Sequence, residues 1–307
     1  ISNPQYLNGL HIADEAFLHP KAGAGQAAFA QRKPVMALPL IHAGSPAILR
    51  HFCMAHQVEV YRRADAVVAL SPPERQFVAG WGVPEGRIHH VPLGVEPPAT
   101  GQTAQRQARG RASDEGLPSR YILFLGAATY DKGAFDLAQA GAALALGGED
   151  VAIVYAGSQQ HQLSVFIDTH RPGMRAILQE RLHLLGQVDE ETKQKLLAGC
   201  MALALPSRVD CLGLVLLEAW QEGKPGGGAK VGGRASRLAP EESGLLVPFG
   251  KPEELTLALR RLLHEPGLAA RLGAAGRRAV IQQYTWDKCY AAFYQIALAV
   301  CRNRERR

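Results

Sequence analysis

The sequence predicts an α/β protein built from two domains of parallel strands and connecting helices. Short apolar runs alternate with helix-length segments along most of the 307 residues. One stretch rich in Gln, Arg, Gly and Ser interrupts this alternation and has the composition of a linker. The length is sufficient for two domains, each with its own core. We therefore expect a first domain over residues 1–98, a linker over 99–120, a second domain over 121–284 and a final helical segment over 285–307.

The first domain is predicted to contain strands over residues 34–41, 65–70 and 87–92. A helix is expected over residues 47–63, and another begins after Ser71 and ends near Gly80. Ser71 suits the capping position of that helix, because its hydroxyl can accept a hydrogen bond from a free backbone N–H of the first turn. Pro72 fits the first helical position, where no backbone N–H is needed.

The second domain repeats the strand–helix alternation four times. Strands are predicted over residues 121–125, 151–156, 182–185 and 202–205, and helices over 134–146, 161–179, 190–198 and 214–221. Strands separated by helices form parallel pairs, since the connection must cross back over the sheet. Three successive helices, over residues 253–264, 268–283 and 286–301, follow.

Composition and charge narrow the class of protein. The five cysteines are scattered without a C-x-x-C pair, which favours reduced thiols and a cytoplasmic location. No apolar run approaches 18 residues. The net charge of +6 and the basic tail are compatible with an anionic substrate, with peripheral contact to an anionic membrane, or with a solvated helix end. No basic stripe with interleaved aromatic residues indicates nucleic-acid binding.

The segment from Pro206 to Ala219 is the most informative for function. It follows an apolar strand, carries Asp210 in a loop, and places Gly213 before a helix that contains Glu218. A helix N-terminus binds anions through its unpaired backbone N–H groups. At 1.5 Å per residue the two carboxylates lie about 12 Å apart, which exceeds the separation of a glycosidase pair. This spacing suits a ligand with hydroxyls at both ends and phosphates between them, such as a nucleotide-sugar.

Several segments, in order, resemble the retaining glycosyltransferases of group 1, family four, which have the GT-B fold of two Rossmann-like domains. The motifs of the first domain are residues 64–71, 81–84 and 92–96, and those of the second are 123–126 with Lys132-Gly133, 210–218, 242–248 and 284–287. The resemblance extends from about residue 34 to the C-terminus. It implies an incomplete N-terminal domain, because the family's Gly-rich first turn is absent and the chain begins at Ile1.

The resemblance implies a metal-independent transfer, with retention, from a nucleoside-diphosphate sugar to an acceptor hydroxyl. The expected catalytic residues are Lys132 at the diphosphate, Asp210 at the sugar and His42 facing the donor sugar. The expected donor-binding residues are Glu218 at the ribose, Leu212, Gly213 and Leu214 at the phosphates, Gly126 in the first turn of the second domain, and Gln187 and Val188 at the base. The final helix is expected to cross back to the first domain, as in the family.

No cofactor or metal is expected, and no D-x-D motif occurs in the sequence. The acceptor stays open among a glycan, a lipid and a small molecule, and the donor sugar and base are not specified by these residues. Structural interpretations also stay open: Asp210 suits a helix cap, and Lys132, Glu218 and His42 can be solvated surface residues.

Departures from the family pattern leave a second function open, that of a nucleotide-sugar-binding module without turnover. Asp210 replaces the usual Glu, Ala127 stands where an Arg often pairs with the phosphate, and Ser236 replaces a Glu. Three glycines, residues 226–228, replace a β-branched strand. A third alternative, a dehydrogenase or epimerase of similar fold, lacks the expected dinucleotide fingerprint.

Overall fold

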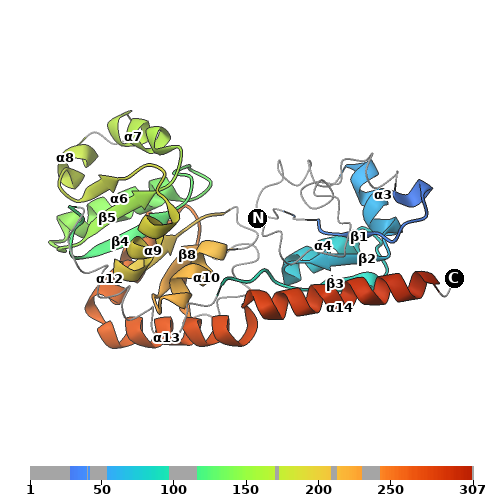
Figure 1. The fold of residues 1–307 in the computed structure, drawn as a ribbon. Coiled ribbons are helices and arrows are strands. Elements are labelled where there is room, and N and C mark those ends of the chain that lie inside the picture. The colour runs from blue at the N-terminus through green and yellow to red at the C-terminus, as the bar shows by residue number, and fades with distance from the viewer. Residues whose placement is uncertain are drawn as a thin grey trace. The chain divides into compact units, whose positions relative to one another are not determined.

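The computed structural model describes residues 28–39, 41, 54–96, 116–169, 173–208, 213–229 and 243–305. The chain forms two compact units (Figure 1). The first comprises Ile1–Pro92 together with Tyr290–Arg307, and the second comprises Leu93–Cys289. The second unit is therefore one continuous segment inserted into the first. No helix in the described ranges is long and apolar enough to cross a membrane.

The first unit contains a three-stranded parallel sheet of order β1-β2-β3. Its elements are β1 (Met36–Ala37), α3 (Ala55–Arg63), β2 (Ala66–Ala69), α4 (Pro72–Gly80), η3 (Glu85–Arg87) and β3 (Ile88–His90). Tyr61, Val67 and Val78 are fully buried in its core. Ser71 caps α4 as predicted, accepting a hydrogen bond of 3.3 Å from the Glu74 N–H. The strand predicted over residues 34–41 is wrong in length, because only Met36 and Ala37 pair with β2.

Glu74 fixes the ends of two strands in this unit. Its carboxylate accepts hydrogen bonds from the backbone N–H of Ile41 at 2.6 Å and of Leu70 at 2.5 Å. Burial raises the pKa of Glu74, and the two backbone hydrogen bonds partly oppose that rise. The buried carboxylate thus has hydrogen-bond partners in two segments, at Ile41 four positions after β1 and at Leu70 directly after β2.

The second unit contains a six-stranded, fully parallel sheet of order β6-β5-β4-β7-β8-β9. Its strands are β4 (Tyr121–Leu125), β5 (Ala152–Ala156), β6 (Leu182–Leu184), β7 (Ala202–Leu205), β8 (Gly226–Ala229) and β9 (Gly244–Val247). Counted within the unit, this order is 3-2-1-4-5-6, the doubly wound Rossmann arrangement. The first and fourth strands, β4 and β7, are neighbours, with Leu123 opposite Leu203.

Helices cover both faces of this sheet (Figure 1). One apolar core joins alternate residues of β4 and β5 to α6 (Ala134–Leu146), α7 (Gln160–Thr169), α8 (Met174–Leu178) and α12 (Pro252–His264). The other joins the opposite set to α9 (Glu190–Gly199), α10 (Leu214–Gln221) and α13 (Pro266–Gln283). Strands buried on both faces explain the continuous apolar runs that made them predictable.

One prediction in this unit is wrong, and one departure from the family pattern does not prevent strand formation. The helix predicted over residues 161–179 is two helices, α7 and α8, and Gly173 precedes α8 with a left-handed φ of 85°. The glycine run at 226–228, which lacks β-forming side chains, nevertheless forms β8 between β7 and β9. A Cβ at Gly226 would approach Leu216 Cδ1 within 2.2 Å, so the absent side chain lets α10 pack closely on this strand.

The second unit begins and ends at adjacent points. Val95 forms a parallel bridge with Thr285, through hydrogen bonds from Val95 N to Tyr284 O at 2.8 Å and from Trp286 N to Val95 O at 3.2 Å. The last helix, α14 (Trp286–Glu305), starts directly after this bridge. From Tyr290 onward it belongs to the first unit, as expected for a helix that crosses back.

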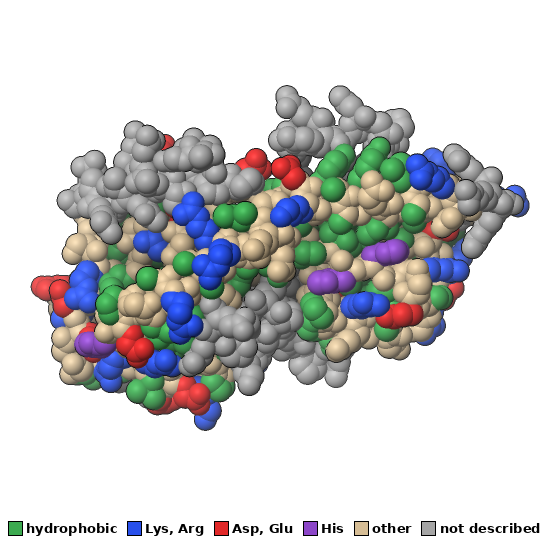
Figure 2. Space-filling view, turned by 90° about the horizontal axis from the view of Figure 1, so that it is seen from below, with side chains coloured by type: hydrophobic (Ala, Val, Ile, Leu, Met, Phe, Trp, Pro, Cys, Tyr) green, Lys and Arg blue, Asp and Glu red, His purple; other side chains and the backbone are tan. Residues whose placement is uncertain are grey.

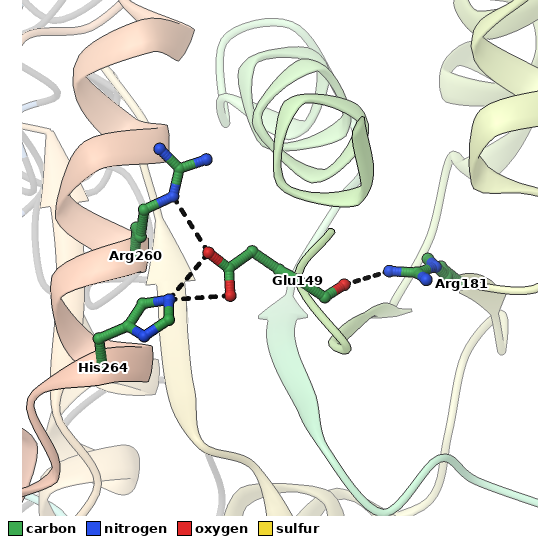
Figure 3. Close-up of polar contacts among 4 residues, drawn as sticks. All are labelled: Glu149, Arg181, Arg260 and His264. Atoms are coloured by element: carbon green, nitrogen blue, oxygen red, sulfur yellow. Dashed lines mark hydrogen bonds and ion pairs between the residues drawn. The ribbon is translucent and has the colours of Figure 1, made fainter. Parts of the chain in front are cut away.

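A polar cluster lies at the amino-terminal end of the six-stranded sheet (Figure 3). The Glu149 carboxylate precedes β5 and contacts two side chains from the last turns of α12, Arg260 Nε at 3.1 Å and His264 Nε2 at 2.9 and 3.0 Å. Arg181 donates to the Glu149 carbonyl. The contacts with His264 and then Arg260 lower the pKa of Glu149 despite its partial burial. Both carboxylate oxygens are occupied, so this cluster ties α12 to the strands.

Charge on the visible surface is dispersed. Figure 2 shows Lys and Arg side chains singly or in small groups, separated by apolar and other residues, on the face that it presents. Among the described residues, that face has no continuous basic patch of the kind that would indicate a polyanion surface.

Candidate functional site

The candidate site lies at the carboxyl-terminal end of the six-stranded sheet. In a doubly wound sheet, ligands bind beside the carboxyl ends of the two neighbouring strands whose helices leave toward opposite faces. Here these strands are β4, followed by the loop 126–133, and β7, followed by residues 206–208 and, before α10, Gly213. The helix α6 packs on one face and α10 on the other. The described residues of both predicted motifs are therefore at this position.

The two loops are tied together by backbone and side-chain contacts. The Arg208 N–H donates to the Asp131 carbonyl at 3.0 Å, and Arg208 Nε contacts Asp131 Oδ1 at 2.7 Å. Gly133 has a left-handed φ of 75°, and a Cβ there would lie 2.3 Å from the Pro206 carbonyl oxygen. Only glycine fits such a close approach without displacing the backbone. These contacts hold the loop after β4 against the residues that follow β7.

Lys132 lies between Asp131 and Gly133 in this paired arrangement. Its backbone N–H donates to Thr129 Oγ1 at 3.4 Å, within the turn that precedes α6. Tyr130, which precedes Asp131 in the sequence, has its ring centroid 5.5 Å from the Arg208 guanidinium. Lys132 is thus anchored through its neighbours on both sides, which limits where its ammonium can reach.

A row of glycines connects the loops after β4, β5 and β6. The Gly157 N–H donates to the Gly186 carbonyl at 2.7 Å, and a Cβ at Gly157 would lie 2.1 Å from the Gly126 carbonyl oxygen. Gln160 completes the connection, since its side chain accepts from the Gly186 N–H at 2.9 Å and donates to the Tyr155 carbonyl at 3.0 Å. The position of the Gly186 turn, where a base is predicted to bind, therefore depends on Gln160.

Gln187 and Val188 follow Gly186 directly. Gln187 is exposed and Val188 is partly buried against the α9 and α10 core. Asp189 then caps α9, accepting a hydrogen bond from the Thr192 N–H at 2.8 Å. This cap fixes the point where the turn becomes a helix.

The second motif helix, α10, starts as predicted. Gly213 is buried and caps it with a left-handed φ of 55°, and Leu214 is its first residue. Trp220 is fully buried and donates through Nε1 to the Ser243 carbonyl at 2.9 Å, which anchors the helix. Glu218 is two positions before this anchor, so its place on the helix is well defined.

Glu218 forms an ion pair with Lys193 of α9. Lys193 Nζ lies 2.9 Å from Glu218 Oε1 and 2.8 Å from Glu190 Oε2. The side chains of Lys193 and Glu218 are only 21% and 25% exposed. Burial of the Lys193 ammonium opposes its charge, but contacts with Glu190 and Glu218 outweigh burial and raise the pKa of Lys193. The Lys193 ammonium therefore stays charged at neutral pH.

The predicted site residues that the structure describes all belong to the carboxyl-end loops and helices of this sheet. They are Gly126, Lys132, Gln187, Val188, Gly213, Leu214 and Glu218. Asp210, Leu212 and His42 lie outside the described residues, as does Ser236. The sequence interpretation missed Lys193, Gln160 and the Arg208–Asp131 pair, whose partners are 25 to 77 positions away in the chain.

Comparison with known proteins is consistent with this geometry. Residues 106–279 match the family described as "Glycosyl transferases group 1". The chain is 30% identical over 259 residues to a D-inositol 3-phosphate glycosyltransferase of Xylanimonas cellulosilytica, covering 81% of this chain and 60% of the relative. It is 32% identical over 174 residues to the D-rhamnosyltransferase WbpZ of Pseudomonas aeruginosa, covering 56% of this chain and 43% of that protein. The chain thus spans about half the length of these relatives.

Solved structures with the same fold include sucrose-phosphate synthase from Thermosynechococcus elongatus, with a TM-score of 0.73, 21% identity, and coverage of 92% of this chain and 72% of that one. Anabaena HepE in complex with UDP and glucose matches with a TM-score of 0.72, 20% identity, and coverage of 91% and 74%. These similarities show the two-domain GT-B fold. The family match covers more than half of the sequence, and this chain accordingly belongs to the group 1 glycosyl transferases.

Proposed function

We propose that the chain is the greater part of a metal-independent, retaining glycosyltransferase that uses a nucleoside-diphosphate sugar. The observation that supports this most is the position of both motif loops at the junction of β4 and β7, where a doubly wound sheet binds nucleotides. HepE, a structural neighbour, was solved with UDP and glucose. The donor base, the donor sugar and the acceptor are left open.

In the proposed complex the diphosphate lies between Lys132 and the N-terminus of α10. The N-terminus of α10, at Gly213 and Leu214, is the positive end of the helix dipole and attracts phosphate oxygens. The Lys132 ammonium neutralises charge that develops on the leaving diphosphate. Glu218 accepts hydrogen bonds from the ribose hydroxyls, and Asp210 accepts hydrogen bonds from the sugar.

The proposed chemistry is substitution on the same face of the sugar. The bond from the anomeric carbon to the diphosphate oxygen breaks, the acceptor oxygen bonds to that carbon, and the departing phosphate oxygen takes the acceptor proton. This route needs no carboxylate nucleophile near the anomeric carbon. The product keeps the anomeric configuration of the donor, which NMR of the product would test.

The central test measures nucleotide binding by titration calorimetry. The variant Glu218→Ala should weaken UDP or GDP binding by about 10- to 100-fold, because a hydrogen bond to a charged group contributes about 1.5–3 kcal/mol. Glu191→Ala is the matched control, since Glu191 is 78% exposed and pairs with Lys195 on the surface of α9. Unchanged affinity in Glu218→Ala would contradict the assignment.

One observation favours the second candidate, a binding module without turnover. Ala127, directly after the Gly126 turn, offers a methyl group where the family often has a phosphate-pairing Arg. Nucleotide binding by the chain, with neither donor hydrolysis nor sugar transfer in the presence of glycan, lipid and small-molecule acceptors, would support this alternative. Restoration of turnover by Ala127→Arg would identify the missing cation as the cause.

A further inference from the structure

Lys193 connects the two nucleoside-binding elements of the proposed site. It lies in the first turn of α9, which begins immediately after the Gly186–Asp189 turn proposed to bind the base. Its ammonium reaches Glu218 of α10, proposed to bind the ribose, at 2.9 Å. The two elements are adjacent in the sheet's outer layer, as both α9 and α10 contribute to the same core. Lys193 thus links the two elements through its ion pair with Glu218.

Glu218 lies in mostly apolar, partly buried surroundings, where a cationic partner is favourable. Its neighbours Leu217, Ala219 and Trp220 are buried, and its own side chain is only 25% exposed. An ionised carboxylate in such surroundings is costly to keep unless a cation and hydrogen bonds compensate for lost water. Without Lys193, the carboxylate would be able to turn toward solvent, and the changed direction would weaken the hydrogen bonds that it accepts from ligand hydroxyls.

The ion pair leaves Glu218 able to bind a ligand. The Lys193 contact uses Oε1, whereas an ionised carboxylate offers about four lone-pair positions on two oxygens. Lys193 is in turn held by Glu190 at 2.8 Å, so its ammonium is fixed independently of Glu218. The arrangement orients Glu218 while Oε2 remains available within the described part of the chain. By contrast, both oxygens of Glu149 are already engaged.

We propose that Lys193 is a positioning residue that holds the Glu218 carboxylate oriented for the two ribose hydroxyls, and that it thereby sets the selectivity for ribonucleotides over 2′-deoxyribonucleotides. This inference rests on the proposed function. A site built to hydrogen-bond a hydroxyl discriminates strongly against the analogue that lacks it, because its polar groups are then left unpaired. Selectivity for the 2′-hydroxyl therefore reports on the orientation of Glu218 more directly than overall affinity does.

The experiment compares the full chain with Lys193→Met and with the matched control Lys195→Met. Lys195 is on the same helix, loses the same charge on substitution, and pairs with the exposed Glu191 at 3.3 Å. UDP, GDP and ADP and their 2′-deoxy forms are titrated by calorimetry. The wild-type chain should prefer the ribo form, and Lys193→Met should weaken ribo binding about tenfold with little change in deoxy binding. Lys195→Met should retain the wild-type preference.

Two further variants separate positioning from structural support. Lys193→Arg, which keeps a cation able to reach Glu218, should restore most of the ribo preference, whereas Lys193→Gln should restore little of it. Thermal unfolding of each variant shows whether the fold is intact, and Lys193→Gln serves if Lys193→Met fails to fold. Equal weakening of ribo and deoxy binding, or unchanged ribo binding, would overturn the positioning role. If the wild-type chain binds none of the three nucleotides, the proposed function itself fails, and this inference with it.

Discussion

Each end of the six-stranded sheet has a glutamate paired with basic side chains, but the number of carboxylate oxygens that are engaged differs. At the amino-terminal end, Glu149 is contacted through both carboxylate oxygens by Arg260 and His264 (Figure 3). At the carboxyl-terminal end, Glu218 contacts Lys193 through one oxygen, and the neighbouring loops are glycine-rich. The amino end joins elements that already pack together, whereas at the carboxyl end Glu218 is held through Oε1, and its Oε2 has no partner among the described residues.

The number of engaged carboxylate oxygens is therefore a criterion that separates a purely structural ion pair from one that can also bind a ligand. Both carboxylate oxygens of Glu149 already have protein partners, so we expect this cluster to contribute to stability. A carboxylate with one oxygen engaged is oriented yet still able to accept hydrogen bonds. Each of the following substitutions tests whether the two ends differ in this way, beginning with the largest expected effect.

Substitution Lys132→Ala should reduce sugar transfer or donor hydrolysis by about 100- to 1,000-fold, the usual effect of removing one charge-stabilising group from a transition state. Nucleotide affinity should fall much less, because Lys132 is proposed to act mainly on the developing charge. Single-turnover kinetics measures the effect. Lys251→Ala is the control, since Lys251 is an exposed lysine before α12 at the same end of the sheet. Equal rates for Lys132→Ala and wild type would remove Lys132 from the mechanism.

Substitution Gly133→Ala should destabilise the second unit by about 2–3 kcal/mol, because it adds left-handed strain and a contact of 2.3 Å with the Pro206 carbonyl. Urea unfolding measures the loss. Gly148→Ala is the matched control: Gly148 has a φ of 80°, but a Cβ added there would meet nothing within 4 Å, so it should show the strain alone. Equal losses in both variants would show that the close contact of the two loops is unimportant for stability.

Substitution Glu149→Gln should have the smallest effect, a loss of about 0.5–1 kcal/mol at pH 7, since its partners are substantially solvated. The folded-state pKa of Glu149 lies below its unfolded value. Its stabilisation is therefore complete above the ordinary glutamate pKa of about 4.3 and is lost as the pH falls through the lower folded-state value.

The stability difference between Glu149→Gln and wild type should thus shrink in acid, as measured by thermal unfolding between pH 7 and pH 3. Asp168→Asn provides a comparison, because Asp168 pairs with Arg175 on the surface with 48% of its side chain exposed. A Glu149→Gln deficit that stays constant down to pH 3 would contradict the assigned ion pair. Nucleotide affinity should not change in either variant.

The sequence predicted most elements of the second unit because each carries its own local signal. The helix over residues 134–146 matches α6, and that over 214–221 matches α10, each preceded by a glycine. The single helix predicted over residues 161–179 was wrong, although Pro172-Gly173 within it is a breaker pair. The strand β8 has no local signal: its glycines adopt extended pairing because β7 and β9 flank them.

The candidate site was predictable only where a motif concentrates residues within a few positions. Lys132, Gly213 and Glu218 follow from such motifs, and their roles remain predictions. Lys193 could not be found in this way, because its significance depends on α9 lying beside α10, a tertiary relation between residues 25 positions apart. Gln160 is similar, as its contact with Gly186 joins two loops across neighbouring strands.

The bridge between Val95 and Thr285 has a consequence for how this architecture can be varied. Residues 93–289 form one unit, and the chain enters and leaves it near the hydrogen-bonded neighbours Val95 and Thr285, so the two ends of this segment lie close together. Segments with adjacent ends tolerate transplantation and circular permutation well. Exchanging this segment between homologous chains near Val95 and Thr285 would therefore require only two splice junctions.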